Sequence, residues 1–102
     1  MLFSITLIDR PDSAKLRAAN AAAHRAYVTE FFASILLGGP LMAADGTTMI
    51  GSQIVIELAD PSALRAFIDN EPYNRAGLFE QVLTRRFAPV IANPELFEGT
   101  TS

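Results

Sequence analysis

The alternation of apolar and polar residues predicts two β-strands, one at the start of the chain and one near its middle. In residues 2–9 (LFSITLID), Phe3, Ile5 and Leu7 fall on one face and the residues between them on the other. Residues 49–58 (MIGSQIVIEL) give the strongest strand signal, with Ser52 on the same face as the apolar residues Ile50, Ile54, Ile56 and Leu58. A hydroxyl on an apolar face needs a partner, which makes Ser52 a candidate contact for a ligand, a water or a neighbouring backbone group.

Two segments predict helices. Residues 13–33 are good helix formers without internal glycine or proline. Asp60 and Pro61 provide an N-cap and a first-turn proline for a second helix over 61–70.

The remaining segments predict turns and a final strand. Asp45 and Gly46 indicate a turn between two apolar runs. The Gly38-Gly39-Pro40 segment interrupts a short apolar run, and we interpret it as a bend where a side chain would clash. Residues 71–79 (EPYNRAGLF) form a turn or a short helical piece that Gly77 ends, and 80–91 (EQVLTRRFAPVI) form a last strand.

The resulting order, βαββαβ, predicts an α+β fold of the ferredoxin-like type, with a four-stranded antiparallel sheet and both helices on one face. The bare opposite face has to be covered, and a second copy of the sheet is the simplest cover, so we expect a homodimer. Because 102 residues leave room for one hydrophobic core, we expect a single domain over residues 1–98, followed by a polar tail over 99–102.

Composition and charge exclude several functions. The formal charge is −3 and the densest basic cluster is the pair Arg85-Arg86, which argues against binding to nucleic acid or to an anionic membrane surface. The absence of cysteine excludes disulfides, thiolate catalysis and sulfur-ligated zinc. The longest uncharged stretch is 14 residues, too short to span a bilayer. The N-terminal apolar run is too short for a signal peptide and follows no basic segment, so we expect a cytoplasmic protein.

His24 is the only histidine and lies on the first predicted helix. Arg17 and Tyr27 share its helical face, which is polar at the N-terminal end and aromatic at the C-terminal end. Such a mixture suits a small-molecule pocket between helix and sheet. Two interpretations remain open: a catalytic proton carrier, or a surface or hydrogen-bonded structural histidine.

A catalytic imidazole usually needs a carboxylate that fixes its tautomer. Asp9 at the end of the first strand, Asp45 in the turn and Glu71 after the second helix are the candidates. Each also has a structural interpretation, the two aspartates as turn formers and Glu71 in the first turn of a short helix. One histidine without cysteine does not suggest a transition-metal site, and we expect no metal and no cofactor.

The order and spacing of several short motifs resemble the YCII-related (YciI-like) family over residues 2 to about 89. The matching positions are Asp9, Arg17, His24, Gly39-Pro40, Gly51-Ser52, Pro72-Tyr73 and Ala76-Gly77. The resemblance implies a dimeric α+β barrel and a pocket in which a histidine and an acidic residue transfer a proton. This chain has Glu71 where relatives usually have aspartate before Pro-Tyr, so its carboxylate reaches about one methylene further.

The leading hypothesis is therefore a small-molecule enzyme of the isomerase or lyase type, acting on a small organic acid or lactone. His24 would move the proton, with Glu71 or Asp45 orienting it. Arg17 would pair with a substrate carboxylate, while Ser52 and Tyr73 donate hydrogen bonds and Tyr27 and Asp9 complete the binding residues. The alternatives are a non-catalytic dimeric module that binds a metabolite, and a protein resembling the cofactor-independent monooxygenases.

Overall fold

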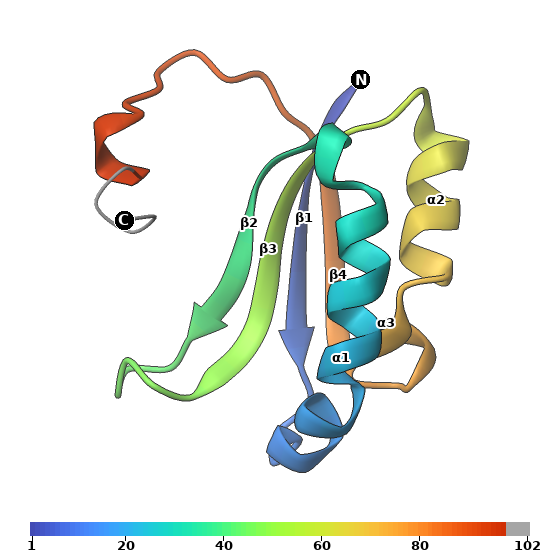
Figure 1. Cartoon of the computed structure of the whole chain (residues 1–102), viewed down its shortest axis with the longest axis vertical. Helices are drawn as coiled ribbons and strands as arrows, with labels where there is room; N and C mark the ends of the chain where they lie inside the picture. The colour runs from blue at the N-terminus through green and yellow to red at the C-terminus, as the bar shows by residue number, and fades with distance from the viewer. Residues whose placement is uncertain (98–102) are drawn as a thin grey trace.

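The protein folds around one antiparallel sheet with its two longest helices on one side (Figure 1). The structure is a computed structural model that describes residues 1–97. The strands are β1 (Leu2–Asp9), β2 (Ile35–Met42), β3 (Met49–Glu57) and β4 (Phe79–Arg86). The helices are α1 (Ala14–Glu30), the short 3₁₀ helix η1 (Phe32–Ser34), α2 (Pro61–Asp69) and α3 (Pro72–Arg75). The predicted boundary between residues 98 and 99 lies outside the described residues.

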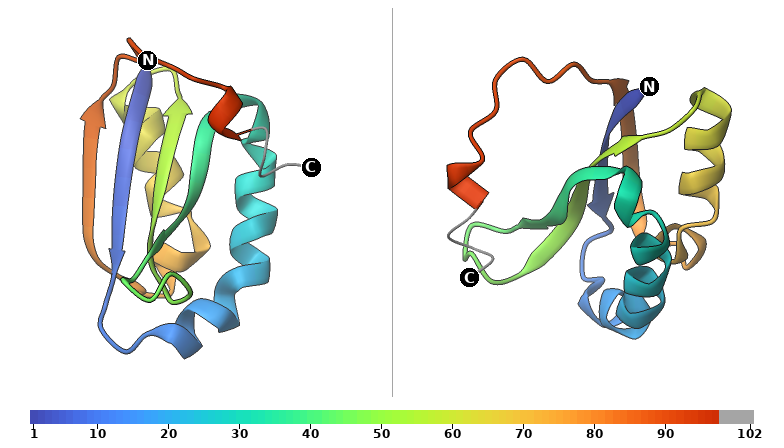
Figure 2. Two further views of the ribbon diagram at one scale, coloured as in Figure 1. Left: turned by 90° about the vertical axis from the view of Figure 1, so that its left-hand side faces the viewer. Right: turned by 45° about the horizontal axis from the view of Figure 1, so that its top comes forward.

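The strand order is β2-β3-β1-β4, and all three pairings are antiparallel. With α1 and α2 as crossovers on the same face, this is the ferredoxin-like α+β fold, as the sequence predicted. The left-hand view of Figure 2 looks onto the opposite face of the sheet, which α1, α2 and α3 leave uncovered.

The alternation in β1 separates the two faces of the sheet. Phe3, Ile5 and Leu7 are buried under the helices and join the core around Ile54 and Ile56 of β3. The polar residues on the helix-free face hydrogen-bond across the strands. Thr6 Oγ1 donates to Gln53 Oε1 at 2.7 Å, and Gln53 Nε2 donates to Ser4 Oγ at 2.8 Å.

Helix α2 packs its apolar face against the core. Asp60 caps its N-terminus by accepting a hydrogen bond from the Ala63 amide at 2.8 Å, as the sequence suggested. Leu64 and Phe67 are the buried residues of α2. Phe67 contacts the aromatic rings of Tyr27 and Phe31, which joins α1 to α2.

Three predictions about local structure were wrong in detail. The Gly38-Gly39-Pro40 segment is not a bend but part of β2, and a Cβ at Gly39 would have no atom within 4 Å. The first helix ends at Glu30, because the chain turns through η1 into β2. The last strand ends at Arg86, because its partner β1 begins at Leu2. The Leu2 carbonyl accepts a hydrogen bond from the Phe87 amide, and β1 offers no partner beyond it.

Within residues 1–97, no helix has the length and apolar character needed to cross a membrane. After β4 the chain leaves the sheet and arches away from it (Figure 1), with Val90 and Ile91 exposed.

Candidate active site

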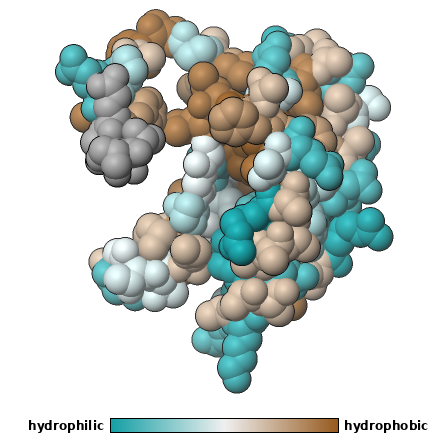
Figure 3. Space-filling view, viewed as in Figure 1, coloured by the Kyte–Doolittle hydropathy of each residue, from teal (hydrophilic) through white to brown (hydrophobic). Residues whose placement is uncertain are grey.

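A groove of about 1110 Å³ lies between α1 and the β2–β3 side of the sheet. Small side chains open it: Ala14, Ala18 and Ala21 recur on one face of α1, and Gly38 and Gly39 lie across from them on β2. In Figure 3, apolar surface gathers around the upper end of β2 and the η1 segment that leads into it. A concave site with mainly apolar walls suits a small organic molecule.

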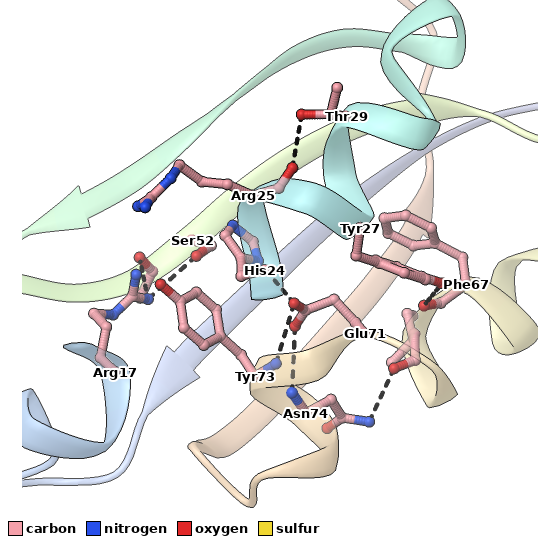
Figure 4. A network of polar contacts seen from close by, with 12 residues as sticks. Arg17, His24, Arg25, Tyr27, Thr29, Ser52, Phe67, Glu71, Tyr73 and Asn74 are labelled. Atoms are coloured by element: carbon pink, nitrogen blue, oxygen red, sulfur yellow. Dashed lines mark hydrogen bonds and ion pairs between the residues drawn. The ribbon is translucent and has the colours of Figure 1, made fainter. Parts of the chain in front are cut away.

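His24 lies on the wall of this groove, and its ring is anchored from behind by Glu71 (Figure 4). Nδ1 is 2.7 Å from Glu71 Oε1, and the two side chains are 20% and 3% exposed, respectively. The Nε2 atom makes no hydrogen bond to any group of residues 1–97. Because an ionised carboxylate only accepts hydrogen bonds, this contact favours the tautomer of a neutral imidazole that carries its hydrogen on Nδ1 and has Nε2 as the basic atom.

Glu71 is held in place by the helix that follows it. Its Oε1 accepts a hydrogen bond from the Tyr73 amide at 3.1 Å, and its Oε2 accepts one from the Asn74 amide at 3.3 Å. These bonds make Glu71 the N-cap of α3, which ends near Gly77 in the left-handed region at φ +78°. Glu71 therefore has both roles: it caps α3, as its structural interpretation predicted, and it contacts His24.

Tyr73 is buried in a stack of three flat groups. Its ring lies 4.2 Å from the His24 ring at an interplanar angle of 18°. The Arg17 guanidinium carbon lies 4.7 Å from the ring centroid of Tyr73. Tyr73 thereby fixes the orientation of the imidazole and links it to Arg17.

The Arg17 guanidinium is committed to the protein itself. Nε donates to Asp9 Oδ2 at 2.8 Å and Nη2 to Oδ1 at 3.1 Å, a bidentate pair. Nη2 also donates to the Gly51 carbonyl at 2.9 Å and to Ser52 Oγ at 3.2 Å. Burial lowers the pKa of Arg17, but the hydrogen bond and charge of Asp9, together with Tyr73, outweigh it, so the net pKa is raised.

The family of the chain follows from comparison with known proteins. The YCII-related domain matches residues 1–88. The chain is also 30% identical over 97 residues to Protein YciI of Escherichia coli O6:H1, covering 88% of this chain and 99% of that protein. The chain belongs to the YCII-related family. The resemblance that the sequence motifs predicted is therefore confirmed.

A solved structure gives a second comparison for this YCII-related chain. The 5-chloro-2-hydroxyhydroquinone dehydrochlorinase (TftG) of Burkholderia phenoliruptrix AC1100, in complex with 2,5-dihydroxybenzoquinone, is 36% identical, with a TM-score of 0.81. The match covers 86% of this chain and 94% of that one. PA3566 of Pseudomonas aeruginosa, at 16% identity and a TM-score of 0.52 over 88% of this chain and 93% of that one, shares the fold.

The structure brings six of the eight predicted site residues into one network: Asp9, Arg17, His24, Ser52, Glu71 and Tyr73. The other two lie elsewhere. Asp45 accepts hydrogen bonds from the amides of Thr47 and Thr48 within its own turn, at 2.9 Å each. The hydrogen bonds from Thr48, then that from the Thr47 amide, lower the pKa of Asp45 to about 2.

Tyr27 lies on the core side of α1 and not in the groove. Its hydroxyl donates to the Phe67 carbonyl at 2.8 Å. Burial, then the charges of Glu71 and Glu30, raise the pKa of Tyr27. The hydroxyl is a structural donor that holds α1 to α2.

Sequence reasoning missed Arg25, which lines the groove next to His24. It also missed the small-residue stripe of α1, although the alanines at positions 14, 18 and 21 recur at helical spacing. Continuing that spacing by four residues reaches Arg25, so the signal was present. Within residues 1–97, no group of three or more histidine and acidic side chains is arranged to hold a metal ion.

Proposed function

We propose that this YCII-related protein is a small-molecule enzyme that transfers a proton by general acid–base catalysis. The observation that carries the proposal is the 2.7 Å contact between His24 Nδ1 and the buried Glu71 carboxylate, on the wall of an apolar groove. The same arrangement of a partner carboxylate behind an imidazole fixes the tautomer in other acid–base enzymes.

In the proposed reaction, His24 Nε2 removes a proton from a substrate held in the groove. Glu71 offsets the positive charge that then develops on the imidazole. The electron pair left on the substrate either expels a leaving group, as in a lyase, or shifts within the molecule, as in an isomerase. His24 then returns the proton to the product or to water.

The dehydrochlorinase relative supports the lyase form of this proposal. Its name describes the removal of hydrogen chloride, a proton and a chloride ion, from a hydroxylated ring, and its structure holds 2,5-dihydroxybenzoquinone. We propose that the substrate here is likewise a flat hydroxylated ring or a small organic acid. Ser52 already accepts a hydrogen bond from Arg17, so its hydroxyl hydrogen is available to a substrate oxygen.

The roles change for three predicted binding residues. We propose that Arg17 and Asp9 are positioning residues, because their charges neutralise each other in a buried pair. We propose that Tyr73 orients His24 by stacking.

The test is turnover of 5-chloro-2-hydroxyhydroquinone, followed by the absorbance of the quinone product, in wild type and variants. We expect His24→Ala to lower kcat by about 10²–10⁴-fold, the usual contribution of a positioned acid–base group. Equal turnover in wild type and His24→Ala would contradict the proposal.

Glu71→Asp separates the two functions of Glu71. Aspartate is a good N-cap, so α3 and the fold should be retained, while the shorter side chain withdraws from Nδ1. We expect lower kcat with little change in the urea midpoint. ¹⁵N NMR should show the Nδ1–H tautomer of His24 in wild type and a mixture in Glu71→Asp. A wild-type ring with its hydrogen on Nε2 would refute the role of Glu71.

We also propose that the chain forms a homodimer through the helix-free face of the sheet. Leu37 and Leu83 lie on this face opposite Val55 and Thr6, and they are 45% and 50% exposed. Light scattering at micromolar concentration should give the dimer mass, and Leu83→Arg should give the monomer. A monomeric wild type would refute this interface. The cytoplasmic location expected from the sequence stays a prediction, which cell fractionation would check.

A further inference from the structure

The charges that line the groove differ in sign from those of the chain as a whole. The protein carries 11 acidic residues and a formal charge of −3, yet no carboxylate is among the described residues that line the groove. The ionisable side chains other than Tyr73 on its wall are Arg17, His24 and Arg25. A cleft lined by one sign of charge attracts ligands of the opposite sign.

Two of these three groups already have a carboxylate partner within the protein. Asp9 neutralises Arg17 through two hydrogen bonds, and the Glu71 carboxylate takes up Nδ1 of His24. Neither therefore presents an unbalanced positive charge to a ligand. Arg25 differs from both, because its guanidinium takes part in no ion pair or hydrogen bond with residues 1–97.

The backbone of Arg25 is fixed while its side chain is exposed to the groove. The residue lies within α1, and its carbonyl accepts a hydrogen bond from Thr29 Oγ1 at 2.7 Å. Figure 4 shows the side chain leaving α1 towards the side on which Ser52 and the Arg17 guanidinium lie. A ligand between Arg25 and Ser52 would lie next to the imidazole of His24.

We propose that Arg25 binds the anionic oxygen of the substrate and thereby selects for negatively charged ligands. The flat guanidinium offers parallel N–H donors to a carboxylate or to the paired oxygens of an ionised hydroxyquinone. With the anionic edge on Arg25, the rest of a small ring lies over the apolar alanine stripe and its reacting atom faces His24. This inference names the ligand charge class for the site proposed above and rests on that site being the substrate groove.

The test measures binding separately from turnover. The probe is 2,5-dihydroxybenzoquinone, an anion at neutral pH, and the neutral comparison ring is hydroquinone. Calorimetric titrations would use wild type, Arg25→Gln and Arg65→Gln. Arg65 is an exposed arginine of α2 that does not line the groove, so its variant is a control for the loss of one surface charge.

We expect Arg25→Gln to weaken binding of the anion by about 10- to 100-fold, the range for losing a charge-assisted hydrogen bond. Arg65→Gln should bind like wild type, and Arg25→Lys should recover part of the loss. Wild type should prefer the anion over hydroquinone, and Arg25→Gln should lose that preference. The salt dependence of anion binding should also be smaller in Arg25→Gln.

Equal affinity of wild type and Arg25→Gln for the anion, or no binding of the anion to wild type, would overturn the inference. The outcome for the proton-transfer proposal is read independently. If the anion binds through Arg25 but His24→Ala has the same turnover as wild type, acid–base catalysis by His24 fails and the inference about Arg25 stands. If His24→Ala loses turnover and Arg25→Gln binds normally, the reverse holds.

Discussion

Replacing Arg17 by methionine should destabilise the protein far more than replacing any exposed arginine. The change removes two hydrogen bonds to Asp9, one to the Gly51 carbonyl and one to Ser52, all from a residue that is 7% exposed. It also leaves the Asp9 carboxylate, whose side chain is 6% exposed, without its counter-charge.

Breaking a buried ion pair from one side costs about 3–5 kcal/mol, because an uncompensated charge remains. The total stability of a domain is about 5–15 kcal/mol, so the loss is a large fraction of it. For a domain of this size, each 1 kcal/mol lowers Tm by about 4–8 °C, which gives an expected fall of about 12–40 °C.

The measurement is urea unfolding followed by far-UV circular dichroism. Wild type and variants must be compared at the same protein concentrations, because the unfolding of the proposed homodimer would depend on concentration. Arg65→Met on the exposed side of α2 is the control, and its free energy of unfolding should lie within about 0.5 kcal/mol of wild type.

A double-mutant cycle tests whether the cost comes from the pair. In Asp9→Asn/Arg17→Met the uncompensated carboxylate is gone, so the double variant should be more stable than the sum of the single changes predicts, by about 0.5–3 kcal/mol. An Arg17→Met variant within about 1 kcal/mol of wild type would refute the reasoning. The guanidinium would then be available to a substrate carboxylate, as the sequence first suggested.

Three further predictions concern the scaffold. Asp45 has a pKa of about 2, below its ordinary value of 3.8, so its turn hydrogen bonds contribute stability above pH 3.8 that is lost as pH falls through about 2. The Thr48 amide resonance should therefore titrate with a midpoint near 2, and a midpoint near 4 would contradict this. Gly51→Ala should lower the free energy of unfolding, since a Cβ there would collide with the backbone of β1, whereas Gly39→Ala, with open space around it, should change stability little; equal urea midpoints would refute the collision. Tyr27→Phe should cost about 1 kcal/mol by removing the hydrogen bond to α2 and leave ligand binding unchanged, and calorimetry that shows weaker binding would place Tyr27 in the site after all.

The fold was predictable because its signals are local. The two-residue period of β1 separates Phe3 and Ile5 from Ser4 and Thr6, and the structure buries the first pair and pairs the second with Gln53 across the strands. The prediction of a bend at Gly38-Gly39 was wrong because it also rested on local sequence alone. Glycine in a strand marks close approach only where a neighbour is near, and that neighbour is visible only in the folded chain. Gly51 has one, and Gly39 does not.

The partners within the site were less predictable, because they depend on contacts far apart in the sequence. His24 and Glu71 are 47 positions apart, and only the resemblance to the YCII-related family, whose members usually have an acidic residue before Pro-Tyr, distinguishes Glu71 from Asp45. The hydrogen-bond partners of Arg17 could not be predicted from the sequence for a physical reason. An arginine on a helix face looks available to a substrate until the register of β1 and β3 brings Asp9 and the Gly51 carbonyl to it.

The network around Tyr73 gives the site its rigidity without help from a ligand. Glu71 caps α3 and holds the imidazole, and the helix that it caps begins with the tyrosine on which the imidazole stacks. Arg17 closes the other side of that ring and is itself fixed to two strands. A change at any of these positions therefore acts on the orientation of His24 as well as on stability. Arg25 stands outside this network, so affinity for an anion can be altered there while the orientation of the imidazole is preserved.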